Sequence, residues 1–486
     1  MILASSRIGA MKRSRKPWLA LLAVVGALLA ASLWWAMARI DSFDQLLRYQ
    51  ADRDYRYDLK DTQARRVTVQ LTPEGFIWPS LTAAWDTAFL RFSLQTNLAG
   101  RLVDPYLEMA WRSVKSRQYF ERGAGGVRYL NLSQLAAGPP AAGDQVSLKG
   151  VNLHWQGQKA TLVLFANPPV DHARILVVAP HPDDAEIAAF GLYSHRDAYV
   201  VTITAGEAGD AFPEPGKERD TDLMRLHLIK GRLRVWDSLA VPLWGGLGPD
   251  RSLNLGYFDS SLGQMYRAPL AEIASLTIPQ ADLSAFRQSE GWPLRHKRRG
   301  RPSWRDLVSD LRQVLRHVRP QVIVTPHPWL DEHPDHHYAT LAVLQALREE
   351  GLIEGSLYLY TNHHVLSEVY PFGEAGSLVT LPPWMDGGWL FTSVYSHPLD
   401  HARQVDKYFA LEAMHDLRYW YGDQTTSLDF LGAGLRRARQ EMMDVKGARS
   451  YFRRAVRVNE LFFVVPVSQA ERLLVRPRPA RRCVRD

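Results

Sequence analysis

An alternation of short apolar runs and helical periodicities in the middle of the chain constrains the fold more than any other feature of the sequence. Residues 173–179 (ARILVVA) form a continuous apolar run, which is typical of a strand buried on both faces. Residues 304–318 place leucines and valines at helical spacing. Further strands are predicted over 199–204, 321–325 and 356–361, and a further helix over 338–348. This order predicts an α/β fold with a Rossmann-like, mainly parallel sheet and helices on both faces.

The segment before this alternation has a different pattern. A chain of 486 residues exceeds the usual size of one hydrophobic core, so two or more domains are expected. Between residues 66 and 168, short runs rich in valine, leucine and aromatic residues show partial alternation and are separated by glycine and proline. This pattern predicts a small β-sandwich. A glycan-binding module and a rigid spacer both remain open as its role.

The N-terminal part carries an uncharged apolar run over residues 18–38. At about 1.5 Å per residue, a helix of this length crosses a hydrocarbon core of ~30 Å. Basic residues over 12–16 precede the run, so the positive-inside rule leaves the N-terminus in the cytoplasm. We therefore expect a single-pass protein of the inner (plasma) membrane with the rest of the chain periplasmic or extracellular. A cleaved signal peptide is the alternative, because Ala36-Met37-Ala38 resembles an A-x-A site, but the run is longer than a usual signal core.

Charge and cysteine content exclude several classes of protein. The net charge of +8 gathers in clusters at 7–16, 295–301 and 472–485, without a recognition helix or interleaved basic and aromatic residues. Nucleic-acid binding is therefore not expected, and contact with an anionic glycan or lipid is favoured. Cys483 is the single cysteine of the sequence, which excludes an internal disulfide framework and a cysteine-based zinc cluster.

Polar residues follow the first buried strand directly, in the motif His181-Pro182-Asp183-Asp184. Two aspartates at the start of a helix can serve as caps that satisfy its N-terminal dipole. Capping accounts for one aspartate, but it gives no reason for a histidine and two carboxylates at one strand end. A metal site is the competing interpretation.

A second polar motif, His333-Pro334-Asp335-His336, lies in the loop after the strand 321–325. A polar surface loop is the alternative, since other histidines lie nearby. Sites in parallel sheets lie beyond the carboxyl ends of the strands, so the two motifs are expected to meet. A catalytic zinc site needs three N/O ligands and one open position, and His181, Asp184 and His336 can supply the three. That leaves Asp183, His333 and Asp335 for acid–base and orienting roles.

These motifs resemble the PIG-L/LmbE-like zinc deacetylases, which include enzymes that remove acetate from N-acetylglucosamine linked to inositol, malate or lipid. The stretch APHPDDAEIAAFG, with Glu186, is similar to the opening A-H-P-D-D motif of the family. His333–His336 is similar to its later H-x-D-H, and residues 204–209 to its T-x-G-E-A-G. The similarity extends from about Ile175 to His415.

The resemblance implies a role for each residue of the two motifs. His181, Asp184 and His336 would bind Zn²⁺, and Asp183 would be the general base. His333 would stabilise the oxyanion and Asp335 would orient His333. The implied activity is zinc-dependent hydrolysis of an N-acetyl group on an amino sugar of a cell-envelope, lipid-linked or secreted glycan, with release of acetate. Zinc suits this reaction because it polarises a carbonyl and makes water acidic near pH 7.

The sequence departs from the family pattern in three places. Relatives often carry R-x-x-E on the helix after T-x-G-E-A-G, whereas Arg225 is followed by Leu226-His227-Leu228. Residues 245–301, which include Asp259, are long for this connection and are expected to shape the pocket. Two histidines after the strand 356–361 either line the site or serve a structural role: these are His363 and His364. Asp416-Leu417 replaces the Ser-Gln that usually follows the position of His415.

Two other functions compete with the deacetylase. One is a zinc amidase with a non-sugar substrate, and the other is a catalytically silent glycan-binding scaffold. A binding module has no need of adjacent Asp183 and Asp184, which favours the enzyme. The predicted division of the chain is a basic tip with a transmembrane anchor over 1–40, a β-rich accessory domain over 41–169, a deacetylase domain over 170–470 and a basic tail over 471–486.

Overall fold

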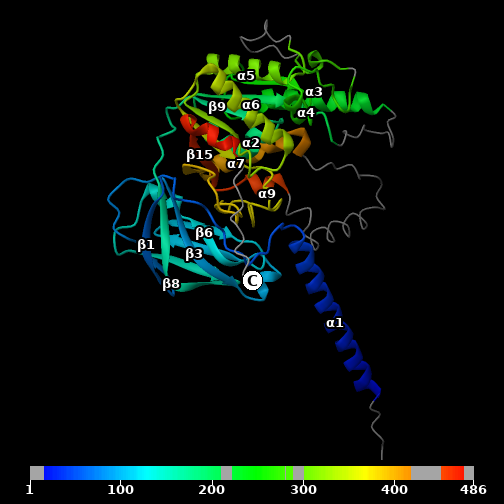
Figure 1. Cartoon of the computed structure of the whole chain (residues 1–486). Helices are drawn as coiled ribbons and strands as arrows, with labels where there is room; N and C mark the ends of the chain where they lie inside the picture. The colour runs from blue at the N-terminus through cyan, green and yellow to red at the C-terminus, as the bar shows by residue number, and fades with distance from the viewer. Residues whose placement is uncertain (1–15, 210–221, 280, 288–299, 418–449, 476–486) are drawn as a thin grey trace, which may run out of the picture.

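The computed structural model describes residues 16–209, 222–279, 281–287, 300–417 and 450–475. Its described part contains two sheets, with the antiparallel sheet below the α/β layers in Figure 1. The basic clusters at 7–15, 295–299 and 476–485, and Cys483, lie outside the described residues.

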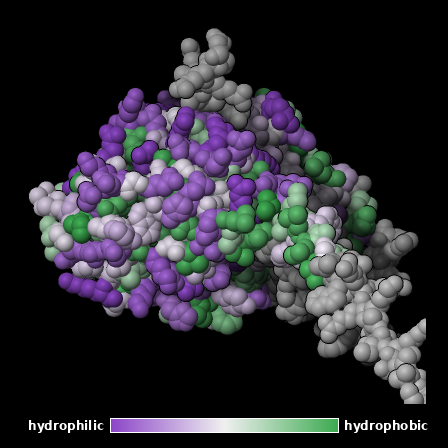
Figure 2. Space-filling model, turned by 90° about the horizontal axis from the view of Figure 1, so that it is seen from below, coloured by the Kyte–Doolittle hydropathy of each residue, from purple (hydrophilic) through white to green (hydrophobic). Residues whose placement is uncertain are grey.

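The first sheet is antiparallel throughout and has eight strands in the order β5-β4-β7-β2-β1-β8-β3-β6. Its strands are β1 (Arg65–Thr72), β2 (Gly75–Ile77), β3 (Thr87–Thr96), β4 (Tyr106–Trp111), β5 (Val114–Tyr119), β6 (Gly125–Asn131), β7 (Gln145–Val151) and β8 (Leu153–Phe165). In β7, Val146 and Leu148 are buried between exposed neighbours, the pattern of a sheet with one face in solvent. The surface seen from below is mostly hydrophilic (Figure 2).

The second sheet has seven strands in the order β11-β10-β9-β12-β13-β15-β14. Its strands are β9 (Ile175–Ala179), β10 (Ala198–Thr204), β11 (Ser252–Tyr257), β12 (Val322–Pro326), β13 (Ser356–Tyr360), β14 (Ser393–Pro398) and β15 (Asn459–Pro466). The run from β11 to β13 is parallel, but β15 pairs antiparallel with both β13 and β14.

The predicted fold class is therefore wrong. The second sheet is mixed and not mainly parallel. Two strands that were not predicted, β15 and β14, extend one edge of the sheet, and β15 pairs antiparallel with both of its neighbours. The N-terminal strands form one continuous eight-stranded sheet where two stacked sheets were expected. Short alternating runs are compatible with either arrangement, and only the pairing of distant strands decides between them.

Helices cover both faces of the mixed sheet. Alternate residues of β9 belong to two different cores: Leu176 and Val178 pack with α5 (Trp304–Val318) and α6 (Pro334–Glu350), and Val177 packs with α2 (Asp184–Tyr193) and α7 (His401–Ala413). The strand is thus buried on both faces, as its apolar run predicts. The other described α-helices of this region are α3 (Leu223–Trp244), α4 (Leu262–Arg267) and α9 (Tyr451–Ala455).

The helix predicted over 338–348 begins earlier, because α6 starts at Pro334. His333 is its N-cap residue, and its Nδ1 accepts the backbone N–H of Asp335 at 3.3 Å. Proline is favoured in the first turn, since it has no N–H to leave unpaired. Asp335 and His336 therefore lie in the first turn of a helix and not in a free loop.

The N-terminal helix α1 (Lys16–Asp44) extends away from the two sheets (Figure 1). Within the described ranges, no helix combines the length and the apolar character needed to span a membrane. The predicted transmembrane anchor is contradicted. The single-pass inner-membrane location, which depended on that anchor, is contradicted with it.

Apolar contacts join the two sheets into one structure. The rings of Phe165 in β8 and Phe391 lie 6.2 Å apart, and Phe391 lies 5.2 Å from Phe463 in β15. At the end of α1, Phe43 and Leu47 pack with Tyr119 and the segment 369–379. The division of the chain between residues 169 and 170 stays a prediction.

Candidate active site

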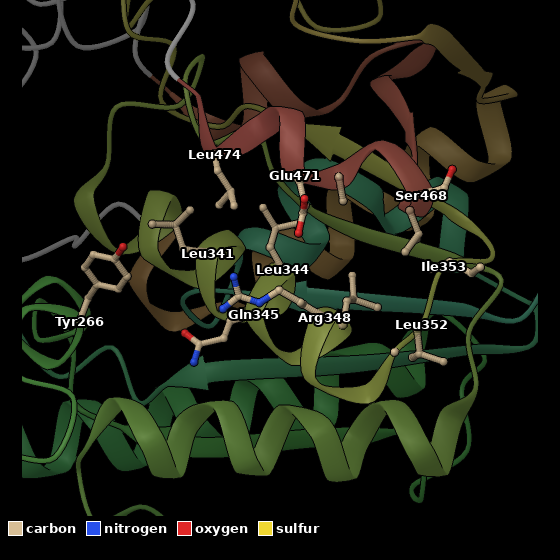
Figure 3. A pocket seen from close by; sticks show the side chains of 14 residues that line it. Tyr266, Leu341, Leu344, Gln345, Arg348, Leu352, Ile353, Ser468, Glu471 and Leu474 are labelled. Carbon is tan, nitrogen blue, oxygen red and sulfur yellow. The ribbon is translucent and has the colours of Figure 1, made fainter.

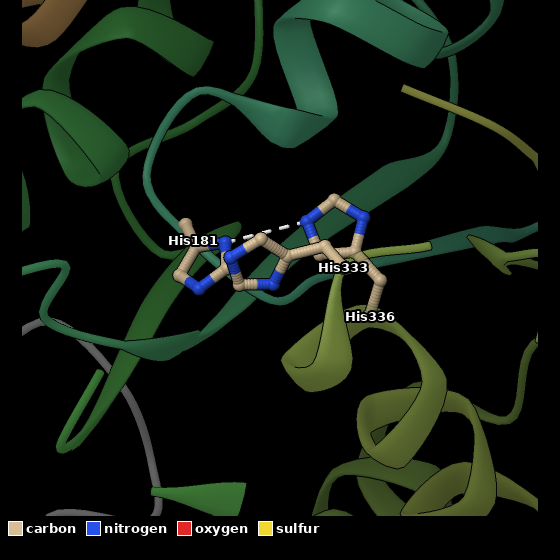
Figure 4. A group of neighbouring side chains, drawn as sticks. All are labelled: His181, His333 and His336. Atoms are coloured by element: carbon tan, nitrogen blue, oxygen red, sulfur yellow. Dashed lines mark hydrogen bonds between the residues drawn. The ribbon is translucent and has the colours of Figure 1, made fainter. Parts of the chain in front are cut away.

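The two polar motifs meet at the carboxyl edge of the parallel strands. β9 pairs directly with β12, so the residues that follow each strand come together where α2 and α6 begin. The rings of His181, His333 and His336 face one another there (Figure 4). His181, Asp184 and His336 are buried, as is Asp335.

Three potential ligand atoms form a nearly equilateral triangle. His181 Nδ1 lies 3.2 Å from Asp184 Oδ2, His336 Nε2 lies 3.1 Å from the same oxygen, and the two nitrogens are 3.3 Å apart. Tetrahedral coordination with bonds of about 2.1 Å separates ligand atoms by about 3.4 Å. The donor set of two imidazole nitrogens and one carboxylate oxygen is also one that zinc accepts. These residues therefore fit a zinc ion.

Electrostatics in the triangle also favour a cation. Burial alone would raise the pKa of Asp184, but His336 and His181 hold it well below its usual value. Burial opposes a charged His336, yet Asp184 and Asp331 raise the pKa of its imidazole to about 10. The carboxylates thus favour positive charge in a buried space, and a divalent cation would supply it.

The remote nitrogen of His181 faces two more carboxylates. Its Nε2 lies 3.2 Å from Asp259 Oδ1 and 3.4 Å from Asp335 Oδ2. Asp335 also accepts the backbone N–H of Ser260 at 2.7 Å. These contacts leave Nδ1 as the nitrogen that faces Asp184, and they bring Asp259 into the site.

Asp183 has a strained backbone and a buried side chain. Its φ of 120° is unusual for a residue with a Cβ, and strain of this kind gathers at functional sites. The Asp183 side chain does not cap α2, which removes the capping interpretation. Its Oδ2 accepts a hydrogen bond from Arg234 Nη2 at 3.0 Å. Burial raises the pKa of Asp183 to about 7, although Arg234 acts in the opposite direction.

His333 presents one nitrogen to the site as a donor. Because its Nδ1 accepts the Asp335 backbone N–H, a neutral ring carries the proton on Nε2. Burial, and then the neighbouring His181, lower the pKa of His333 to about 4, so the neutral ring dominates. His333 contacts Asp335 through the backbone N–H of Asp335, whereas the Asp335 carboxylate faces His181 and Ser260. The catalytic roles of these residues stay predictions.

The arginine of α3 that reaches the first of the two motifs is Arg234, which was not predicted from the sequence. Arg225 is exposed. Arg234 is buried and donates to the backbone oxygens of Gly206 and Pro182 as well as to Asp183. Three residues later, Asp237 accepts from His415 Nδ1 at 2.7 Å. The signal was the R-x-x-E motif with aspartate in place of glutamate, in Arg234-Val235-Trp236-Asp237.

The two histidines after β13 differ in position. The His363 ring lies 5.1 Å from that of His336 and 5.4 Å from that of His333, and its nitrogens contact Tyr451 Oη at 3.2 and 3.3 Å. His364 is buried away from this cluster, and its Nδ1 accepts the backbone N–H of Leu366. His363 therefore lines the site, whereas His364 has a structural role.

A hollow of about 280 Å³ lies elsewhere, between the C-terminal half of α6 and η7 (Val467–Leu474) (Figure 3). Leu341, Leu344 and Leu474 give it an apolar lining. None of the predicted site residues lines this hollow.

Comparisons with known proteins agree with this geometry. Residues 176–347 match the family model PIG-L, described as GlcNAc-PI de-N-acetylase. The 1D-myo-inositol 2-acetamido-2-deoxy-alpha-D-glucopyranoside deacetylase of Kineococcus radiotolerans is 30% identical over 187 residues, which are 37% of this chain and 46% of the relative. The chain thus spans a little less than half the length of this relative.

Two solved structures are also similar. The A40926 pseudoaglycone deacetylase Dbv21 has a TM-score of 0.33 at 18% identity, covering 61% of this chain and 99% of that chain. The zinc inhibited form of teicoplanin deacetylase Orf2 has a TM-score of 0.32 at 16% identity, covering 60% and 98%. The match over residues 176–347 confirms the resemblance seen in the sequence: this part of the chain is similar to the PIG-L family.

Proposed function

We propose that this protein is a metal-dependent N-deacetylase that hydrolyses the acetamido group of an amino sugar. The observation that carries the proposal is the triangle of His181 Nδ1, Asp184 Oδ2 and His336 Nε2, with edges of 3.1 to 3.3 Å. The match of residues 176–347 to the PIG-L model and the similarity to an inositol glycoside deacetylase support the reaction class.

In this proposal the metal is Zn²⁺, held by His181, Asp184 and His336. A zinc ion there would supply Lewis-acid chemistry, polarising the acetyl carbonyl and making water acidic near pH 7. Asp183 accepts the proton of the attacking water as the water oxygen bonds to the acetyl carbon. The Nε2–H of His333 donates to the acetyl oxygen as negative charge develops on it.

The second half of the reaction returns the proton. Asp183 donates it to the sugar nitrogen as the C–N bond breaks, so that acetate and a free amine leave. Arg234 keeps the Asp183 carboxylate in place through a hydrogen bond of 3.0 Å. The buried positions of these groups support the mechanism, since electrostatic interactions are stronger where water is excluded.

The proposed substrate is the amino sugar of a cell-envelope, lipid-linked or secreted glycan. The names of the matched family and relative support a glycan, because both describe acetylated glucosamine attached to inositol. The net charge of +8 favours a substrate that carries anionic groups. Asp259 adds a polar group that suits a sugar beside the metal ligands.

A zinc amidase for a non-sugar amide is the second candidate, and a silent glycan-binding scaffold is the third. Burial of Asp183 beside Asp184 favours an enzyme over the scaffold, because two buried carboxylates are costly and a binding module does not need them.

Acetate release is the test. The protein with zinc would be given N-acetylglucosamine, its oligosaccharides, GlcNAc-phosphatidylinositol and simple acetylated amides. We expect release from glycans, and none from any substrate with Asp183→Ala. Release from the simple amides alone would favour the amidase, and no release from the whole panel would favour the scaffold.

A further inference from the structure

We propose that Asp331 and Asn362 are positioning residues that select which atoms of the predicted metal ligands coordinate the ion. This inference rests on the proposed metal site. Neither residue belongs to the two motifs: Asp331 lies in the connection from β12 to α6, and Asn362 follows β13. Asp331 contacts His336, and Asn362 contacts Asp184.

Asp331 controls the proton on His336. The Asp331 side chain is fully buried, and its Oδ1 lies 3.0 Å from His336 Nδ1. A nitrogen lone pair facing a buried carboxylate at this distance would be repelled, so Nδ1 must carry the proton. The lone pair of the neutral ring is then on Nε2, the nitrogen that lies 3.1 Å from Asp184 Oδ2. Metal-ligating histidines commonly have such a carboxylate partner.

Asn362 controls the carboxylate of Asp184 in a corresponding way. Its Nδ2 donates to Asp184 Oδ1 at 2.8 Å and to the Asp184 backbone oxygen at 3.3 Å. The first of these hydrogen bonds occupies Asp184 Oδ1. The other oxygen, Oδ2, faces both His181 and His336 and is the one available to a metal ion. The amide thereby favours coordination through one defined oxygen.

The two positioning residues are linked to each other. Asp331 Oδ2 accepts the backbone N–H of Asn362 at 2.8 Å and that of His363 at 3.2 Å, and Oδ1 accepts the backbone N–H of His333 at 3.1 Å. One carboxylate therefore joins the residues after β12 to those after β13. Loss of either positioning residue is expected to displace both ligands, so their effects should be less than additive.

Asp331→Asn and Asn362→Ala test the inference against a purely structural role. Asp310→Asn is the matched control, because Asp310 is also a buried carboxylate, bonded to Tyr257 Oη at 2.9 Å and to Arg287 at 3.0 Å. Zinc affinity would be measured by competition with a chromophoric chelator, and the ligand field by the visible spectrum of the cobalt form. The melting temperature would be recorded for each metal-free protein.

We expect Asp331→Asn and Asn362→Ala to weaken zinc binding about 10- to 100-fold and to alter the cobalt spectrum. Asp310→Asn should lower the melting temperature without either effect. Wild-type zinc affinity in both positioning variants, with His336→Ala unable to bind zinc, would overturn this inference and leave the metal site intact. Zinc retained by His336→Ala would instead reject the proposed site itself. If Asp331→Asn does not fold, Asn362→Ala decides, because the side-chain Nδ2 of Asn362 donates directly to Asp184.

Discussion

Arg234 Nη2 donates a hydrogen bond to Asp183 Oδ2 over 3.0 Å, and the same guanidinium binds the backbone oxygens of Pro182 and Gly206. One buried arginine therefore joins the residues after β9 to those after β10. It also holds the proposed general base, whose backbone is strained. The position of Asp183 thus depends on a residue 51 positions away in the sequence.

Arg234→Gln should retain zinc and lose turnover. A hydrogen bond to a charged group contributes about 1.5–3 kcal/mol, which corresponds to roughly a 10- to 100-fold loss in kcat when the base is no longer held. Arg225→Gln is the control, since Arg225 is exposed on the same helix and should have wild-type turnover. Steady-state acetate release and zinc content check both variants. A larger loss in the Arg225 variant would show that the exposed arginine holds the substrate.

Asp183→Asn should bind zinc and release acetate roughly 10²–10⁴-fold more slowly, because the amide cannot accept a proton from water. Glu186→Gln separates this role from that of the neighbouring carboxylate. Glu186 Oε1 accepts from Tyr193 Oη at 2.8 Å, so its replacement should leave most turnover. Single-turnover acetate release measures both variants. Near-native release by the Asp183 variant would assign the base to another residue.

His336→Ala should abolish stoichiometric zinc binding while the protein stays folded. His337→Ala is a matched control from the next position of α6, because the His337 ring contacts the Pro328 backbone oxygen at 2.8 Å and lies outside the ligand triangle. Elemental analysis after gel filtration gives the zinc content, and circular dichroism reports folding. Equal zinc in the two variants would reject His336 as a ligand.

His327 makes stability depend on pH. Burial lowers its pKa to about 4, although the contact of its Nε2 with the Leu390 oxygen at 3.1 Å acts in the opposite direction. Its Nδ1 accepts backbone N–H groups at 3.2 and 3.3 Å, as only an unprotonated nitrogen can. Between the unfolded value of 6.5 and about 4, the unfolded chain binds more protons than the folded one. The contribution of His327 to the free energy of unfolding is therefore fully present above pH 6.5. It decreases as the pH falls from 6.5 towards 4.

His327→Gln should consequently cost less stability at pH 5 than at pH 7.5. The difference expected from the His327 pKa is about 2 kcal/mol. Other buried groups such as Glu207 titrate in the opposite sense, so the measured quantity is the difference between variant and wild type at each pH. Urea denaturation gives that difference, with His172→Gln as the exposed control. A destabilisation that does not change with pH would contradict the neutral buried state of His327.

Local patterns in the sequence were sufficient to predict part of the fold and part of the candidate site. The apolar run 173–179 predicts a strand buried on both faces, and β9 has that environment, since periodicity and burial act on neighbouring residues. The two histidine–aspartate motifs were found in the same way, because each lies next to its own strand. Their meeting followed from the rule that parallel strands end at one edge.

Only the tertiary structure decided the groups that act on these motifs from a distance. Asp331, Asn362 and Arg234 reach the site from other strand ends or another helix, and the sequence alone does not show which atoms of the two motifs they contact. The antiparallel edge of the mixed sheet and the single eight-stranded sheet also depend on pairing between distant strands. Residue type and spacing therefore determined the chemistry this chain carries, whereas packing determined which nitrogen and which oxygen each side chain presents.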